Sequence, residues 1–207
     1  MKYEVFWKNP NYKGYSQLQK DISCDYLIVG GGISGVSLAY FLSKKCSKKV
    51  VLIEKESIAS GATGQAAGTI VLNGELDLKD IIKLYGEERG LRFWQENINS
   101  LDKMRRLIQK EKINCDLDIE NTIYGSINKE HDNQILEEYT LERDFDKEIQ
   151  FLVGKELKKV VDTKMFRYAV LSPRHGISVN PLMFTQNLAK LVSKNKDYQN
   201  FNFFTFS

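Results

Sequence analysis

The sequence predicts an α/β fold built on a parallel sheet, and three observations support this. Two apolar runs, 26–29 and 50–53, have the continuous hydrophobicity of strands buried on both faces. A glycine-rich turn and a helical pattern over 36–43 separate them, so together they form one βαβ unit. Asn180, followed by proline, is typical of a capped helix start. We expect that helix and a strand at 202–206 to return the chain to the sheet.

The composition is that of an ordinary globular chain. The 207 residues are 42% hydrophobic and 28% charged, with a formal net charge of +3. The charges are scattered, so we expect no nucleic-acid partner, and no segment suits a membrane span. The three cysteines, Cys24, Cys46 and Cys115, fit neither a disulfide framework nor a metal site. We therefore expect a reducing, cytoplasmic setting.

The N-terminal half contains two further predicted elements. Residues 1–23 are polar and aromatic, and we expect an ordered arm that lies on the domain. Residues 80–112 have helical spacing and predict one long helix or two in succession. Gly86 and Gly90 are the points where this helix would bend or break. Trp94 is expected to be a core residue.

The pattern from 115 to 168 is mixed. We expect a strand at 122–127 and a charged helix at 133–147. A loop or short helix follows at 151–157, and a short strand is predicted at 160–161.

The turn after the first strand matches the dinucleotide-binding fingerprint G-x-G-x-x-G in its required context, between a strand and a helix. Gly30 permits the tight turn, Gly32 lets a pyrophosphate approach the backbone, and Gly35 lets the helix pack on the strand. The helix N-terminus then offers N–H groups and positive dipole to phosphates. Glu54, roughly 20 residues further on, would accept hydrogen bonds from both adenosine ribose hydroxyls and repel a 2′-phosphate, which disfavours NADP. A glycine-rich surface turn with a surface acid is the much less favoured alternative.

A second segment, 60–68, has almost no bulky side chain. Such a stretch lets backbone come close to a ligand and direct N–H groups at it. It follows the ribose-binding acid, where a long cofactor would pass. FAD and NAD share the first fingerprint, so this second segment is what favours FAD.

These residues resemble the D-amino-acid oxidase superfamily of FAD-dependent amine oxidoreductases. The group includes glycine oxidase, sarcosine oxidase, γ-glutamylputrescine oxidase and dimethylglycine dehydrogenase. The order of the motifs carries the resemblance more than any one of them. The matching parts are the aromatic arm, 25–35, Glu54-Lys55, 59–68 and 176–181.

The resemblance implies a Rossmann-like FAD-binding domain made of residues 1–75 and 173–207. Residues 76–172 would form part of an α+β substrate domain. Some relatives carry a histidine at the place of Gln65 and bond it to the flavin, so we expect non-covalent FAD here. The predicted cofactor-binding residues are Gly30, Gly31, Gly32, Ile33, Ser34, Gly35, Glu54, Lys55, Ser60, Gly61, Ala62, Thr63, Gly64, Gln65, Ala66, Ala67 and Gly68.

The resemblance also implies a reaction, the oxidation of a C–N bond in a small amine or amino acid. Hydride would pass to flavin N5, and electrons would then pass to oxygen or another acceptor. No catalytic residue can be named, because family members are substantially longer than this chain. Arg174 could hold a carboxylate and His175 could titrate near neutral pH, but a structural role is favoured for both. His131 is expected to be solvated.

Two alternative functions stay open at this point. One is an NAD-dependent dehydrogenase with the same βαβ start, which the small-residue segment disfavours. The other is a truncated or split, non-catalytic FAD-binding subunit, completed by a partner chain that supplies a missing C-terminal half.

Overall fold

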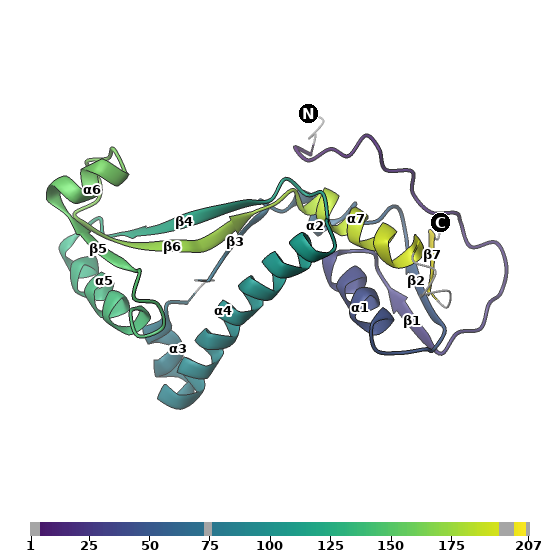
Figure 1. The fold of residues 1–207 in the computed structure, drawn as a ribbon, viewed down its shortest axis with the longest axis horizontal. Helices are drawn as coiled ribbons and strands as arrows, with labels where there is room; N and C mark the ends of the chain where they lie inside the picture. The colour runs from purple at the N-terminus through teal and green to yellow at the C-terminus, as the bar shows by residue number, and fades with distance from the viewer. Residues whose placement is uncertain (1–4, 73–75, 195–200, 206–207) are drawn as a thin grey trace. The chain divides into compact units, whose positions relative to one another are not determined.

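The computed structural model describes residues 5–72, 76–194 and 201–205 (Figure 1). The chain divides into two compact units. Their boundaries lie near the predicted limits at 75 and 173, but 69–72, 108–117 and 173–178 fall in the other unit from the one predicted. The assignment of the units to cofactor and substrate stays a prediction. The first unit is Met1–Gly68, Ile108–Leu117 and Val179–Ser207, and the second is Thr69–Leu107 and Asp118–Ser178.

The first unit is built on a parallel sheet, as predicted. Its strands are β1 (Tyr26–Val29), β2 (Val50–Glu54) and β7 (Phe201–Thr205), in the order β1-β2-β7. Both pairings are parallel. Helix α1 (Ile33–Ser43) packs against helix α7 (Pro181–Lys194), and both are seen beside the sheet in Figure 1.

The two predicted buried strands differ in burial. In β2, Val50, Val51 and Leu52 are each 1% exposed. In β1, Leu27 is 55% and Val29 75% exposed, so the prediction of burial on both faces is wrong there. The cause is position: β1 is an edge strand, paired only with β2 among the described residues.

Helices α1 and α7 of this unit each begin after a residue that caps the first turn. Helix α1 starts earlier than predicted, at Ile33, because Gly32 is its N-cap with an extended backbone. Helix α7 starts at Pro181, and Asn180 caps it, its side-chain oxygen accepting from the Met183 N–H at 3.0 Å. The capped helix start is therefore confirmed.

The described residues of the arm, 5–23, lie on the first unit, as expected. The Trp7 indole N–H donates to the Ala66 carbonyl at 2.7 Å. The Tyr15 ring stacks on Phe203 with ring centroids 5.1 Å apart. Gln17 forms an isolated parallel bridge with Thr205, so the arm reaches the outer edge of β7.

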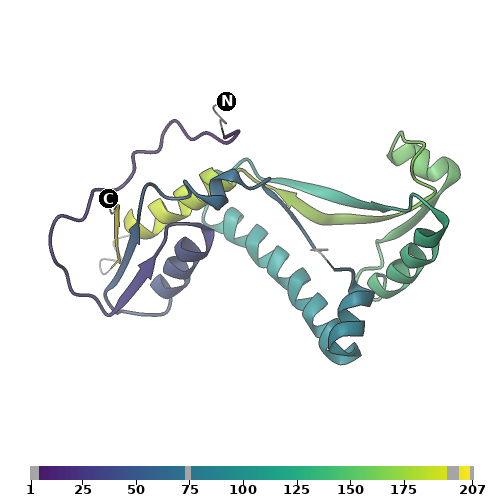
Figure 2. The same ribbon diagram turned by 180° about the vertical axis from the view of Figure 1, so that it is seen from behind.

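The second unit contains an antiparallel sheet (Figure 2). Strands β3 (Thr69–Val71), β6 (Tyr168–Ser178) and β4 (Asp118–Gly125) lie in the order β3-β6-β4. Strand β5 (Gln150–Val153) also pairs with β6. The strand predicted at 122–127 is confirmed over 122–125, which lie in β4, whereas 126–127 follow its end.

Strand β6 was not predicted as a whole. It is 11 residues long and holds the sheet together, since β3, β4 and β5 all pair with it. A proline, an arginine and a histidine stand in its middle and hide the strand pattern. Arg174 has φ 58, in the left-handed region that strands do not normally use.

The long helical region is two helices, α3 (Leu78–Tyr85) and α4 (Glu87–Lys110). The break is at Gly86, whose φ of 82 favours glycine. Gly90 lies within α4 and against Ile82, so it does not break the helix. Trp94 is 1% exposed and is a core residue, as predicted.

Three further helices complete the described fold. The charged helix is α5 (Lys129–Glu142), which begins earlier than predicted because Asn128 caps it. The region 151–157 is divided between β5 and α6 (Gly154–Val160), so the strand predicted at 160–161 is wrong. Helix α2 (Ala62–Gln65) lies within the small-residue segment. No helix in the described ranges is long and apolar enough to cross a membrane.

Candidate functional site

The glycine turn of the first unit leads directly into α1. The first intrahelical bond runs from the Val36 N–H to the Gly32 carbonyl at 3.0 Å. The N–H groups of Ile33, Ser34 and Gly35 therefore have no acceptor inside the helix. The first turn of α1, which is described in full, carries no acidic residue that would repel an anion.

Glycine is found at the three fingerprint positions for different structural reasons. Gly30 has φ 102, so the tight turn predicted there is confirmed. A Cβ on Gly35 would lie 2.1 Å from the Gly30 carbonyl oxygen, which confirms the predicted close packing of helix on strand. A Cβ on Gly32 would meet one atom within 4 Å, the Thr63 hydroxyl oxygen at 3.2 Å, which is a tight contact with a side chain and not with backbone.

Three separate predicted segments meet at the turn. A Glu54 carboxylate oxygen accepts from the Gly31 N–H at 2.6 Å. The Gly31 carbonyl accepts from the Ala59 N–H at 3.0 Å. The Thr63 hydroxyl accepts from the Ile33 N–H at 3.0 Å. The structure thus brings together the glycine turn, the acid after β2 and the start of the small-residue segment.

The small-residue segment is open only in part. Gly61 has nothing within 4 Å of an added Cβ. By contrast, a Cβ on Gly64 would lie 2.3 Å from the Ala59 carbonyl oxygen, and one on Gly68 would lie 2.2 Å from that of Val179. Both of these glycines are buried. We predicted that glycines of this segment leave their backbone accessible to a ligand. This does not hold for Gly64 and Gly68, because protein atoms occupy the space beside them.

The other predicted residues of this segment vary in exposure. Ser60 and Thr63 are half-buried, and Lys55 after β2 is exposed. Ala62, Gln65, Ala66 and Ala67 are exposed as well. That they contact a cofactor stays a prediction.

Ile58 supports the turn but was not predicted as a site residue, and Ala59 and Tyr12 lie near it. A Cβ on Gly31 would lie 2.4 Å from the Ile58 side chain, so Ile58 fixes glycine there. Ala59 has φ 64, a conformation that no feature of its sequence signals. Burial raises the pKa of Tyr12, from the arm, to about 12, and the nearby Glu54 charge contributes to the rise.

The first unit fits FAD by its own geometry. The diphosphate is anionic and suits the N–H groups at the start of α1, next to the open backbone of Gly30 and Gly32. Glu54 uses one lone pair of each oxygen, on the Gly31 and Glu56 N–H groups, and has others left for ribose hydroxyls. Gln65 is exposed but offers no nucleophilic ring nitrogen for a covalent bond.

Arg174 and His175 lie in the second unit, both paired with acids. Arg174 Nη2 lies 2.6 Å from Glu148 Oε2, and His175 Nε2 lies 2.9 Å from Asp146 Oδ2. Burial lowers the pKa of His175, against the opposing effect of Asp146. A cavity of 330 Å³ lies beside this cluster. The pairing supports the structural interpretation of both residues.

The structure also places His131 and Cys115. His131 is on α5 and half-buried, rather than fully solvated. Burial raises the pKa of the Cys115 thiol to about 11, which makes it unreactive. Within the ranges that the structure describes, no three His, Cys, Asp or Glu side chains gather where they could hold a metal ion.

A larger cavity, of about 1030 Å³, lies within the second unit. Side chains of β3, α3 and α4 line it, and most of them are apolar. Arg89, Arg92 and Glu96 add charge at its wall. No sequence pattern predicts this cavity, since its walls come from segments that are apart along the chain.

Comparison with known proteins supports the resemblance. The family model described as DAO, FAD dependent oxidoreductase, matches residues 25–196. The γ-glutamylputrescine oxidoreductase of Escherichia coli (strain K12) is 25% identical over 171 residues, which are 83% of this chain and 40% of that protein. Human (Homo sapiens) mitochondrial dimethylglycine dehydrogenase is 48% identical over 64 residues, which are 28% of this chain and 7% of that protein.

The fold is also found in solved structures. Glycine oxidase from Geobacillus kaustophilus matches with a TM-score of 0.70 at 20% identity, over 88% of this chain and 46% of that one. At this identity the match shows the fold alone. The chain spans less than half the length of these relatives.

Proposed function

The chain belongs to the DAO family of FAD-dependent oxidoreductases, and on that premise we propose that its first unit binds FAD without a covalent bond. The pyrophosphate lies along Gly30–Gly35, the adenosine ribose is held by Glu54, and the cofactor continues along the exposed part of 60–68. We further propose that the whole protein oxidises the C–N bond of an amine or amino acid. Its setting is proposed to be cytoplasmic.

One observation supports the cofactor site above the others. The Glu54 carboxylate, the Ala59 N–H and the Thr63 hydroxyl all bond to the backbone of the glycine turn. Segments separated by many residues therefore hold one short stretch of backbone at the N-terminus of α1. Such rigid support is what a preorganised phosphate site requires.

The chemistry divides between cofactor and protein. FAD, when bound, supplies a hydride acceptor at flavin N5 and passes the electrons on to oxygen or another acceptor. The residues of this chain bind and orient: α1 offers N–H groups to anionic phosphates, and Glu54 accepts from hydroxyls. The charge of Glu54 also disfavours a 2′-phosphate on the same ribose.

The test of cofactor binding begins with the purified chain. Its visible spectrum is recorded before and after denaturation, and we expect flavin absorbance that is released into solution on denaturation. The G32V variant, prepared identically, is the control and should release little flavin. A colourless chain that binds NADH and not FAD would contradict the proposal and support the dehydrogenase.

A second candidate concerns these 207 residues alone. The chain spans less than half of its relatives, which favours FAD binding without turnover until further polypeptide completes the fold. Secondary amines and amino acids are screened for bleaching of the flavin without air. Bleaching by the 207-residue chain alone contradicts this second candidate. If no amine bleaches a longer, FAD-loaded form, the proposed reaction class is wrong.

A further inference from the structure

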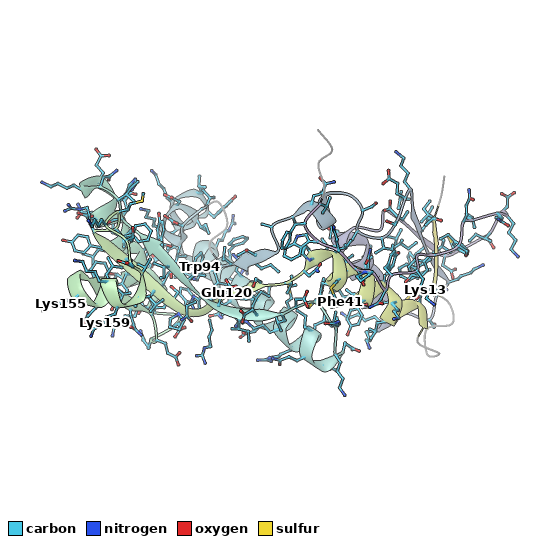
Figure 3. The ribbon with its side chains drawn as sticks, turned by 90° about the horizontal axis from the view of Figure 1, so that it is seen from above. Lys13, Phe41, Trp94, Glu120, Lys155 and Lys159 are labelled. Atoms are coloured by element: carbon cyan, nitrogen blue, oxygen red, sulfur yellow. The ribbon has the colours of Figure 1, made fainter. Side chains whose placement is uncertain are left out.

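We propose that the N-terminal arm positions the small-residue segment of the cofactor site, with Trp7 as the principal positioning residue. The inference rests on the proposed function, since it assigns further residues to the same FAD site. The arm lies outside the part of the chain that the family model matches, which begins at residue 25. Figure 3 draws the side chains of the arm, where Lys13 is labelled.

Helix α2, inside the small-residue segment, is too short to be stable by itself. It has four residues, and isolated helices shorter than about 12 residues are marginal in water. Gly61 is its N-cap, and no side chain caps that end with a hydrogen bond. Contacts from other parts of the first unit therefore hold α2 in place.

Trp7 supplies such a contact at the other end of α2. Ala66 is the C-cap of this helix, and its carbonyl accepts from the Trp7 indole N–H at 2.7 Å. A carbonyl at a helix end has no donor within the helix, so the indole satisfies it. The ring also lies beside Gly68, where an added Cβ would be 3.0 Å from it. Trp7 thus fixes the end of α2 and the chain that leaves it.

Helix α2 transmits this support to the glycine turn. Thr63 is on α2, and its hydroxyl accepts from the Ile33 N–H at 3.0 Å. A displaced α2 would move this hydroxyl and the backbone of Gly61 away from the start of α1, where the phosphates are proposed to bind. Trp7 therefore acts on the site through α2.

Asn9 provides a second route from the arm to the same segment. Its side-chain amide donates to Gln186 Oε1 at 2.9 Å, and Gln186 Nε2 donates to the Ile58 carbonyl at 3.1 Å. Gln186 is 4% exposed, so water competes little for these bonds. The Ile58 side chain is the one that closes off Gly31. The arm thus reaches both ends of the stretch 58–66.

The test compares two arm variants of the full 207-residue chain by fluorescence titration with FAD. Trp7→Phe keeps an aromatic ring beside Gly68 but removes the N–H donor. We expect its FAD dissociation constant to rise about three- to tenfold, as for the loss of one hydrogen bond. Tyr15→Phe is the control. It removes a hydroxyl that lies 3.1 Å from Ser193 Oγ, on α7, and should leave the dissociation constant unchanged.

Hydrogen exchange of the apoprotein measures the position of α2 without the cofactor. The Gly64 N–H donates to the Gly61 carbonyl at 3.1 Å. Its exchange should become about threefold or more faster in Trp7→Phe and stay unchanged in Tyr15→Phe. The circular dichroism spectra of the two variants should match that of the original chain.

A double-mutant cycle tests whether Trp7 acts through α2. Thr63→Val removes the hydroxyl that links α2 to the Ile33 N–H. In that background, Trp7→Phe should raise the FAD dissociation constant by less than about twofold. Equal fold-changes in the two backgrounds would overturn the proposal.

Three other results would overturn it as well. One is equally tight FAD binding by Trp7→Phe and the original chain, and another is unchanged exchange of Gly64 in Trp7→Phe. The third is an equal loss of FAD affinity in Tyr15→Phe, which would make the arm a general stabiliser of the fold. Failure of the proposed function gives a different pattern. If Gly64 exchanges faster in Trp7→Phe while no form of the chain binds FAD, the positioning of α2 stands and the proposed function fails.

Discussion

The glycine turn at 30–35 and the small-residue segment at 60–68 look alike in sequence but differ in structure. In the turn, an added Cβ would meet nothing within 4 Å at Gly30 and only the Thr63 hydroxyl, at 3.2 Å, at Gly32, whereas Ile58 closes off Gly31 and the Gly30 carbonyl closes off Gly35. In the segment, Gly61 is open, whereas Gly64 and Gly68 are pressed against other carbonyl groups. A glycine can therefore do one of two things: it leaves space for a ligand, or it lets other protein backbone pack closely. The sequence alone does not distinguish them.

The largest expected effect is at Gly68. Gly68→Ala places a Cβ 2.2 Å from the Val179 carbonyl oxygen, at a φ of 83 that disfavours alanine. We expect a loss of about 3 kcal/mol in the free energy of unfolding, measured by urea denaturation. Gly61→Ala, with open space around it, should change the same quantity by less than about 0.5 kcal/mol. Equal losses in unfolding free energy for Gly68→Ala and Gly61→Ala would contradict the distinction between closely packed and open glycines.

Gly32→Val tests the open glycine from the ligand side. A valine is compatible with the extended N-cap backbone, but its Cβ would lie 3.2 Å from the Thr63 hydroxyl, so we expect a stability cost of about 1 kcal/mol. FAD affinity should fall at least about tenfold, which is about 1.4 kcal/mol, because the side chain occupies the phosphate position. Fluorescence titration with FAD measures this. Unchanged affinity would place the phosphates elsewhere.

Glu54→Gln should have a smaller effect. The carboxylate accepts from the Gly31 N–H at 2.6 Å, and an amide oxygen can still accept one bond there. We expect FAD binding to weaken by about 1 kcal/mol, the difference between a charged and a neutral acceptor. Isothermal titration of both forms is the measurement. A loss larger than that of Gly32→Val would show that the acid, and not the open backbone, dominates binding.

Thr63→Val should give the smallest effect, and one that depends on the ligand. The Thr63 hydroxyl accepts from the Ile33 N–H, one of the donors at the start of α1 that have no acceptor within the helix. Without FAD we expect a loss of about 0.5 to 1 kcal/mol in unfolding free energy. With saturating FAD the loss should shrink, because a phosphate oxygen can accept from the same N–H. An equal loss in both states would mean that the cofactor does not use this group.

Local patterns predicted the first unit well. The two apolar runs, the glycine fingerprint and the capped helix at Asn180 each depend on residues that are neighbours in sequence. Burial of β1 could not be predicted in this way, because it depends on which strand lies beside it.

The second unit was harder to predict for a related reason. Strand β6 is defined by its three partner strands, while its own sequence contains Pro173 and the left-handed Arg174. Within the candidate site, Glu54 and Thr63 were found by motif, but Ile58 was not, and Ala59 was included only as the first residue of the matched 59–68 stretch. Their roles depend on packing against Gly31, and no spacing rule records that.

The arm has a consequence for any shortened form of the chain. The family match starts at residue 25, so residues 5–23 lie outside it, yet they satisfy the backbone of Thr205. A chain trimmed to the family boundary would leave both edge strands of the described parallel sheet, β1 and β7, without a pairing segment. Pairing of β7 of one molecule with β1 of the next leaves a new unpaired edge at each step, so the assembly does not close and leads to filaments or precipitation.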